Sequence, residues 1–200
     1  MLWNAWKIGM LCLVVIGAVR AGRAQTARSK PASEALTFNE DGAHRFNGIH
    51  WPDGFRPEQA DLFAHNEIVV HASCEKVFAN IDDAQMWPSW YPNSHNVKLL
   101  NSPDGKLHGG TRFSWDTFGV HIESRVHEFV PNSRIGWFGD GTGMNAYHTF
   151  LLLKTDEGCR IVTEEVVKGP GAVEFRKKQP NAMHDGHDLW LSTLKQRSEN

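Results

Sequence analysis

The 200-residue sequence lacks the features that would place it in several large classes of protein. Its 21 Lys and Arg residues are balanced by 23 Asp and Glu residues, so it has no basic excess for binding nucleic acid. Its three cysteines show no Cys-x-x-Cys or Cys/His spacing typical of structural zinc. The apolar run over residues 8–19 is shorter than the roughly 20 residues of a membrane span. We therefore expect no nucleic-acid partner and no stable membrane span.

What the sequence does contain is the composition of an ordinary globular domain. The hydrophobic residues make up 40% of the chain and 18 glycines add to them. The length suits one domain, or one domain with a tail. Aromatic residues are skewed towards tryptophan and phenylalanine, with Trp 8 and Phe 11 against Tyr 2. This composition excludes disorder, collagen and coiled coil, but it indicates no reaction.

Residues 1–24 have the layout of a secretory signal peptide. Lys7 precedes the apolar run, and small residues then place a cleavage site after Ala24 or after Ala21. An uncleaved N-terminal anchor is the alternative. We expect cleavage and a secreted or periplasmic protein, in which Cys74 and Cys159 remain. An even number of cysteines in an oxidising compartment permits one disulfide.

The rest of the chain predicts a strand, two short helices, a meander of strands and a long C-terminal helix. Residues 25–61 are rich in turn formers and predict a leader that becomes ordered in part near Trp51. Successive strands separated by tight turns favour an antiparallel sheet. The predicted strands span 62–70, 97–100, 111–116, 120–129, 134–138, 145–154 and 160–168. The helices are expected after Ser73, after Asp82 and over 180–196.

This order of elements resembles the helix-grip fold of the START-like (SRPBCC) superfamily, above all its polyketide cyclase/dehydrase-type members. The resemblance runs from Leu62 to the C-terminus, so the predicted domain is 62–200 and residues 25–61 lie outside it. It is carried by six or more motifs in the right order, including Ile68-Val69-Val70-His71-Ala72-Ser73, Met86-Trp87-Pro88-Ser89-Trp90-Tyr91-Pro92, Gly110-Thr111-Arg112-Phe113-Ser114-Trp115, Tyr147-His148-Thr149-Phe150, Thr163-Glu164-Glu165 and His187-Asp188-Leu189-Trp190.

The resemblance implies an α+β fold in which an antiparallel sheet curls around the long C-terminal helix. It implies a deep, mostly apolar cavity for a hydrophobic small molecule and no cofactor. The face of the sheet that meets the helix must be apolar, which predicts the residues that line the cavity. The expected ligand-binding residues are Trp90, Tyr91, Phe113, Trp115, Ile122, Ser124, Trp137, Phe150, His187 and Trp190. The alternative is that these aromatic side chains simply fill the core.

Few polar side chains are expected inside. His148 shares the strand parity of the inward-facing aromatic residues, and one of Glu164 and Glu165 must also face inward. A two-residue loop in the preceding hairpin favours Glu165, and a three-residue loop favours Glu164. Such a His–Glu pair has the groups of a general base and an orienting carboxylate, or is only a polar pair in the pocket wall. His184 and His187 lie about 60° apart on the predicted helix with no third ligand, so we expect no metal.

Two further expectations follow from the resemblance. In the resembled fold the first and last strands pair antiparallel, which implies a disulfide between Cys74 and Cys159. The leading functional expectation is an exported carrier of a lipid, a sterol-like or a polyphenolic molecule. One rival is a cyclase/aromatase-type enzyme that uses His148 with Glu164 or Glu165 to move protons. The other is an interaction module with a vestigial pocket, with residues 36–61 and Trp51 as its contact surface.

Overall fold

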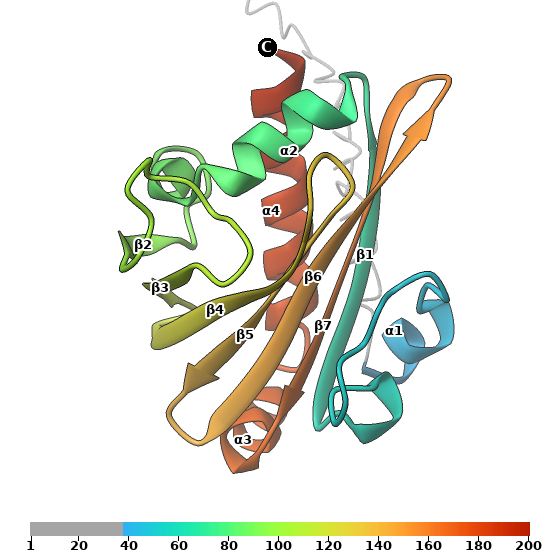
Figure 1. Ribbon diagram of the computed structural model, residues 1–200. Coiled ribbons are helices and arrows are strands. Elements are labelled where there is room, and N and C mark those ends of the chain that lie inside the picture. The colour runs from blue at the N-terminus through green and yellow to red at the C-terminus, as the bar shows by residue number, and fades with distance from the viewer. Residues whose placement is uncertain (1–37) are drawn as a thin grey trace, which may run out of the picture. The chain divides into compact units, whose positions relative to one another are not determined.

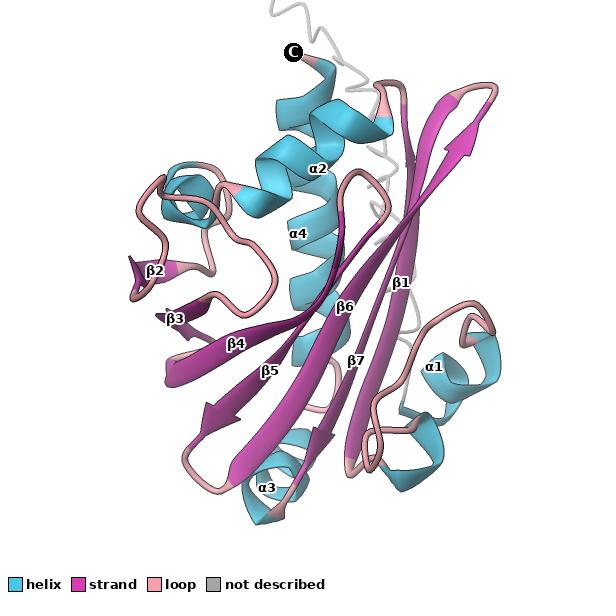
Figure 2. Cartoon of the chain, in the orientation of Figure 1, coloured by secondary structure: helices cyan, strands magenta, loops and turns pink. Residues whose placement is uncertain are grey.

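The computed structural model describes residues 38–200 as one antiparallel sheet around a long C-terminal helix (Figures 1 and 2). The predicted signal peptide and the first part of the leader lie outside the described residues. The strand order is β1-β7-β6-β5-β4-β3-β2. The strands are β1 (Leu62–Val70), β2 (His95–Leu99), β3 (Arg112–Thr117), β4 (Val120–Val130), β5 (Arg134–Gly141), β6 (Met144–Thr155) and β7 (Gly158–Lys168). The predicted helix-grip α+β fold is confirmed.

The α-helices include two that the sequence analysis did not predict. The elements are α1 (Phe38–His44), the 3-10 helices η1 (Pro57–Gln59) and η2 (Ala84–Ser89), α2 (Cys74–Asp82), α3 (Pro170–Lys178) and α4 (Ala182–Glu199). The hydroxyl of Ser73 accepts a hydrogen bond from the backbone N–H of Lys76, which is the predicted N-cap of α2. The unpredicted helices α1 and α3 are short and carry no long apolar stripe, so their sequences give little periodic signal.

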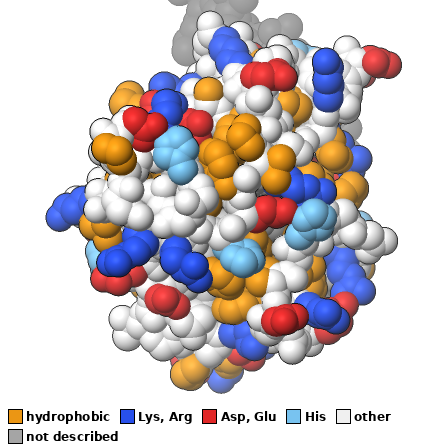
Figure 3. Space-filling view, viewed as in Figure 1, with side chains coloured by type: hydrophobic (Ala, Val, Ile, Leu, Met, Phe, Trp, Pro, Cys, Tyr) orange, Lys and Arg blue, Asp and Glu red, His pale blue; other side chains and the backbone are white. Residues whose placement is uncertain are grey.

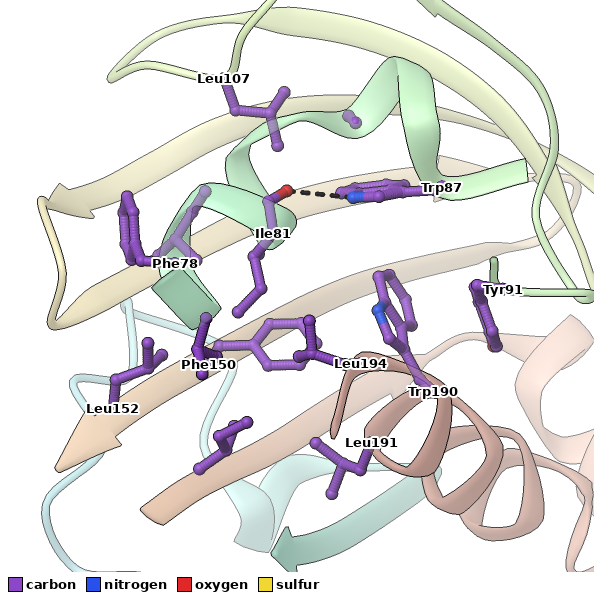
Figure 4. Packing of buried hydrophobic residues seen from close by; sticks show 14 of the residues in the cluster. Phe78, Ile81, Trp87, Tyr91, Leu107, Phe150, Leu152, Trp190, Leu191 and Leu194 are labelled. Atoms are coloured by element: carbon purple, nitrogen blue, oxygen red, sulfur yellow. Dashed lines mark hydrogen bonds between the residues drawn. The ribbon is translucent and has the colours of Figure 1, made fainter. Parts of the chain in front are cut away.

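Aromatic side chains fill most of the space between α4 and the concave face of the sheet. Trp190 on α4 is at the centre of this cluster, with its ring stacked 4.5 Å from Tyr91 and edge-on to Trp87 at 5.1 Å (Figure 4). The indole N–H of Trp87 donates to the backbone carbonyl of Ile81 at 3.0 Å. Such close edge and stacked contacts add stability beyond the apolar area that they bury. The deep cavity implied by the resemblance is therefore largely occupied by the protein's own rings.

The disulfide between Cys74 and Cys159 is present, as the resemblance implied. Strands β1 and β7 pair antiparallel, and Val70 at the end of β1 is opposite Cys159 near the start of β7. Because Cys74 is the first residue of α2, the disulfide joins this helix to the sheet.

Residues 46–55, before β1, pack on the outer face of the sheet, opposite α4 (Figure 1). Ile49 is buried against Leu151 of β6. Trp51 contacts Phe63 and Tyr147, with ring centroids 6.3 and 6.0 Å apart. Part of the contact surface assigned to the interaction-module alternative, including Trp51, is therefore used for packing within the chain.

A partly buried pair of Asp41 and His184 attaches α1 to the start of α4. Asp41 is 2% exposed, and its carboxylate lies 2.9 Å from Nδ1 of His184. The hydrogen bond to Asp41 raises the pKa of His184 above its usual value, against the opposing effect of burial. The chain between α1 and β1 is therefore held at both ends, by this pair and by the start of the sheet.

This pair predicts a specific dependence of stability on pH. A histidine whose folded pKa is raised stabilises the fold fully below its unfolded pKa of about 6.5, and this contribution is lost as the pH rises through the folded value. We expect Asp41→Asn to lower the midpoint of urea unfolding more at pH 5.5 than at pH 8.5. The exposed Asp53→Asn is the control, and an equal loss for Asp41→Asn at both pH values would contradict the prediction.

On the face shown in Figure 3, basic and acidic side chains are interspersed and form no single highly charged region. No helix within residues 38–200 is both long and apolar enough to cross a membrane.

Candidate ligand pocket and its His–Glu–His cluster

The β6–β7 hairpin decides which glutamate faces α4. Thr155 pairs with Gly158, which leaves a two-residue loop, and His148 is directly opposite Glu165. Glu165 therefore lies on the concave face, as expected for the shorter loop. Glu164 is on the outer face and is completely buried, where its carboxylate bonds His65 Nδ1 at 2.7 Å and the backbone N–H of Phe46. Of the two glutamates named as catalytic candidates, Glu164 therefore holds the leader to the sheet and does not line the pocket.

A pocket of about 70 Å³ remains between the concave face, α3 and the first turns of α4. Of the expected ligand-binding residues, six line it: Tyr91, Trp115, Ile122, Trp137, His187 and Trp190. His148 and Glu165 also line it. A cavity large enough for benzene measures about 150 Å³, so this pocket has room for a few waters or a very small molecule as it stands.

Four expected ligand-binding residues lie outside the pocket lining, namely Trp90, Phe113, Ser124 and Phe150. The rings of Phe113 and Phe150 are fully buried, and each packs against the ring of Trp137. The Ser124 hydroxyl accepts a bond from the indole N–H of Trp115 at 3.3 Å. Strand parity places Phe113, Ser124 and Phe150 on the inner face, but the rings of their neighbours separate them from the remaining space.

The sequence analysis missed the far end of the pocket. Its half-buried walls come from the β3–β4 turn, the start of β6 and α3, and include Phe118, Met144 and Phe175. Phe118 and Phe175 contact each other with ring centroids 5.7 Å apart. Since α3 was not predicted, Phe175 had no assigned position. Phe118 sits in a turn with φ of 50°, for which the following Gly119 was the only sequence signal.

His148 has a defined tautomer. Its Nε2 is 2.8 Å from the hydroxyl of Thr163, and that hydroxyl also lies 3.0 Å from the carbonyl of Thr149. A carbonyl only accepts, so the single hydroxyl proton is used there and Nε2–H of His148 donates to Thr163. The other ring nitrogen, Nδ1, then carries a lone pair. Burial lowers the pKa of His148 to about 3, which agrees with a neutral ring.

Glu165 and His187 complete a compact polar cluster with His148, which we call the His–Glu–His cluster. Nε2 of His187 is 3.0 Å from the Glu165 carboxylate, and the two imidazole rings stack with centroids 4.6 Å apart. Burial acts to raise the pKa of Glu165, but electrostatic interactions with the neighbouring histidines and the hydrogen bond from His187 hold this pKa below its usual value. The pocket therefore joins an apolar end to an end with an ionised carboxylate.

Three polar atoms of the pocket lining have no hydrogen-bond partner within the described part of the chain. They are the hydroxyl of Thr117, Nδ1 of His187 and the indole N–H of Trp190, and the last two side chains are about 1% exposed. Buried donors and acceptors left without partners cost about 1–3 kcal/mol each. Unused hydrogen-bonding groups in the lining are suited to a bound polar group or water.

The fold and the pocket define a class: helix-grip proteins with an internal site between the sheet and the last helix. The sequence profile of the family described as "Polyketide cyclase / dehydrase and lipid transport" matches residues 64–199. The chain belongs to this family, and the recognised superfamily is confirmed. No curated protein matches the sequence.

Three solved structures show how far the similarity extends. A hypothetical protein of Helicobacter pylori is 34% identical with a TM-score of 0.71, and the match covers 77% of this chain and 98% of that one. A START superfamily protein of Mycobacterium smegmatis is 16% identical with a TM-score of 0.54, over 68% and 97% of the two chains. A di-domain ARO/CYC of the steffimycin biosynthetic pathway is 14% identical with a TM-score of 0.57, over 68% and 50%. The last two share the fold alone.

Proposed function

We propose that this protein is an exported binding protein for a small, mostly apolar molecule with one polar group. The pocket supports this proposal, because most of its lining is apolar and its charged or titratable end is formed by the His–Glu–His cluster. The observation that carries it is the pair of buried, unpartnered polar atoms on His187 and Trp190. A ligand oxygen that accepts from the Trp190 indole would remove one of these unmet bonds.

The size of the pocket limits which ligands fit without rearrangement. At about 70 Å³ it does not hold a sterol-like or polyphenolic molecule. A ligand of that size requires the half-buried walls to move, and the pair Phe118 and Phe175 lies where the pocket approaches the surface. Binding would then replace the contact between the rings of Phe118 and Phe175 by contacts with the ligand.

Native mass spectrometry of the protein purified from its own host, followed by solvent extraction, tests the proposal. We expect one hydrophobic passenger per chain, and a loss of that passenger in Ala146→Phe, because Ala146 lines the pocket. Ala60→Phe, in the loop before β1, is the matched control and should retain it. An empty wild-type protein that also binds no apolar fluorescent probe would overturn the binding function and favour a vestigial pocket.

An enzyme of the cyclase/aromatase type is the second candidate, supported by the lone pair on Nδ1 of His148 in contact with an apolar site. In this case Glu165, not Glu164, is the partner carboxylate. His148→Ala separates the two functions once a ligand is known. A carrier keeps its affinity within a few-fold, whereas an enzyme keeps binding and loses turnover by about 10²-fold or more.

A further inference from the structure

We propose that His148, Glu165 and His187 bind one divalent transition-metal ion at the polar end of the pocket. One ligand atom from each residue lies within 4.8 Å of the others. Two ligands of a tetrahedral zinc ion, each about 2.1 Å from it, are about 3.4 Å apart. The Glu165–His187 pair, at 3.0 Å, is already near this spacing. The longest separation, 4.8 Å, exceeds this spacing by about 1.4 Å, and the two imidazole rings are stacked with an interplanar angle of 9°. Binding of an ion therefore requires His148 to approach by about that distance and one ring to turn, so that both lone pairs point to the ion.

The three side chains come from rigid, well-packed elements. His148 is on β6, Glu165 is opposite it on β7, and His187 is on α4. Both histidines are at most 3% exposed, and the Glu165 side chain is 16% exposed. A site on adjacent strands and a packed helix holds its ligand atoms with little freedom, which favours a defined coordination geometry.

The surroundings of His148 have the form expected of a metal ligand. A histidine that binds a metal through one ring nitrogen usually donates its other N–H to a fixed acceptor, which sets the tautomer. Thr163 is that acceptor here, so Nδ1 of His148 is available for the ion. His187 uses Nε2 towards Glu165 and has an unpartnered Nδ1, so either ring nitrogen is available after a small change in hydrogen bonding.

The donor set selects the kind of ion. Two imidazoles and one carboxylate suit zinc and similar transition metals better than calcium or magnesium, which prefer oxygen ligands. Three protein ligands leave the fourth position of a tetrahedral ion open, as in catalytic rather than structural zinc sites. That position adjoins the apolar pocket, where an oxygen of a bound small molecule has access to it. Metal binding goes beyond the proposed function and does not depend on it.

Sequence spacing gives no sign of this site. The pair considered in the sequence analysis, His184 and His187, is divided in the structure, because His184 turns away to Asp41. The partners of His187 are instead 22 and 39 positions earlier in the chain and are brought to it by the sheet. The expectation of no metal followed from searching only for ligands near one another in sequence.

Titration of the metal-free full-length protein with Zn²⁺, and separately with Co²⁺, tests the proposal. We expect one high-affinity ion per chain and the visible absorption of cobalt bound by nitrogen and oxygen. Glu165→Gln and His187→Gln should each weaken binding by at least about 10–100-fold, the range seen when even residues that support metal ligands are changed. His121→Gln, an exposed histidine bonded to Asp116, is the matched control and should leave the affinity unchanged.

Two outcomes would overturn the proposal: no ion bound at micromolar zinc, or one ion bound with an affinity that Glu165→Gln and His187→Gln leave unchanged. Circular dichroism of each variant establishes that it is folded, and Glu165→Gln keeps the size of the side chain. An apolar fluorescent probe added without metal measures the pocket separately. Wild-type protein that binds the probe but no metal rejects the metal site alone. Wild-type protein that binds metal but no probe rejects the proposed ligand-binding function alone.

Discussion

Trp190→Ala is expected to lower the free energy of unfolding by about 3–5 kcal/mol, the cost of removing a large buried aromatic side chain. Trp190 is 1% exposed, and its ring contacts Trp87, Tyr91 and Phe150 at 4.5–5.3 Å. Since a domain of this kind has a total stability of about 5–15 kcal/mol, the variant remains folded but is markedly weakened. Urea unfolding followed by circular dichroism measures the change.

The same variant tests whether Trp190 lines a ligand pocket or only fills the core. Removing the indole joins its volume to the adjacent pocket, and the enlarged apolar cavity is expected to bind free indole and recover part of the lost stability. Trp51→Ala is the matched control, because Trp51 packs on the outer face and is half-buried. A variant whose core collapses, with no gain in midpoint from added indole, would show that the space near Trp190 is not a preformed site.

The fold followed from the sequence because its signals are local. Alternating apolar residues mark the strands, tight turns connect them, and the Ser73 cap marks the start of α2. The parity of His148 and its relation to Glu165 also depended only on a hairpin loop of two residues. Each of these features is decided by residues close together in the chain.

The site was harder to predict because its shape depends on contacts between distant segments. Parity places Phe113, Phe150 and Trp137 on one face, but only packing decides which ring is adjacent to the space that remains. The His–Glu–His cluster needs α4 placed correctly against β6 and β7. The wall formed by α3 was missed because that helix is short and its sequence carries no long apolar stripe.

The small volume of the pocket restricts what the family description implies about the ligand. The family description includes lipid transport, whereas about 70 Å³ is far below the volume of a lipid. The ring cluster around Trp190 occupies the space that a large ligand would need. A small ligand that uses the polar end satisfies both the apolar lining and the unpartnered groups, and this agrees better with the structure than a bulky passenger does.

Removal of the disulfide is the second large effect that we expect. Replacing Cys74 and Cys159 together by alanine should lower the free energy of unfolding by about 2–4 kcal/mol, because the bond joins residues 85 positions apart and restricts the unfolded chain. Reductant should lower the stability of the wild-type protein by a similar amount and leave the double variant unchanged. An equal response of both proteins to reductant would contradict a stabilising disulfide.

The number of free thiols tests both the disulfide and the predicted export. The full chain has three cysteines, so the denatured, unreduced protein should show one free thiol, that of Cys12. A chain cleaved after Ala24 or Ala21 has lost Cys12 and should show none. Protein recovered from the compartment outside the cytoplasm is therefore expected to have no free thiol and to begin near Gln25. Two free thiols in that cleaved chain would exclude the disulfide in the cell, and with it the main structural support for an oxidising compartment.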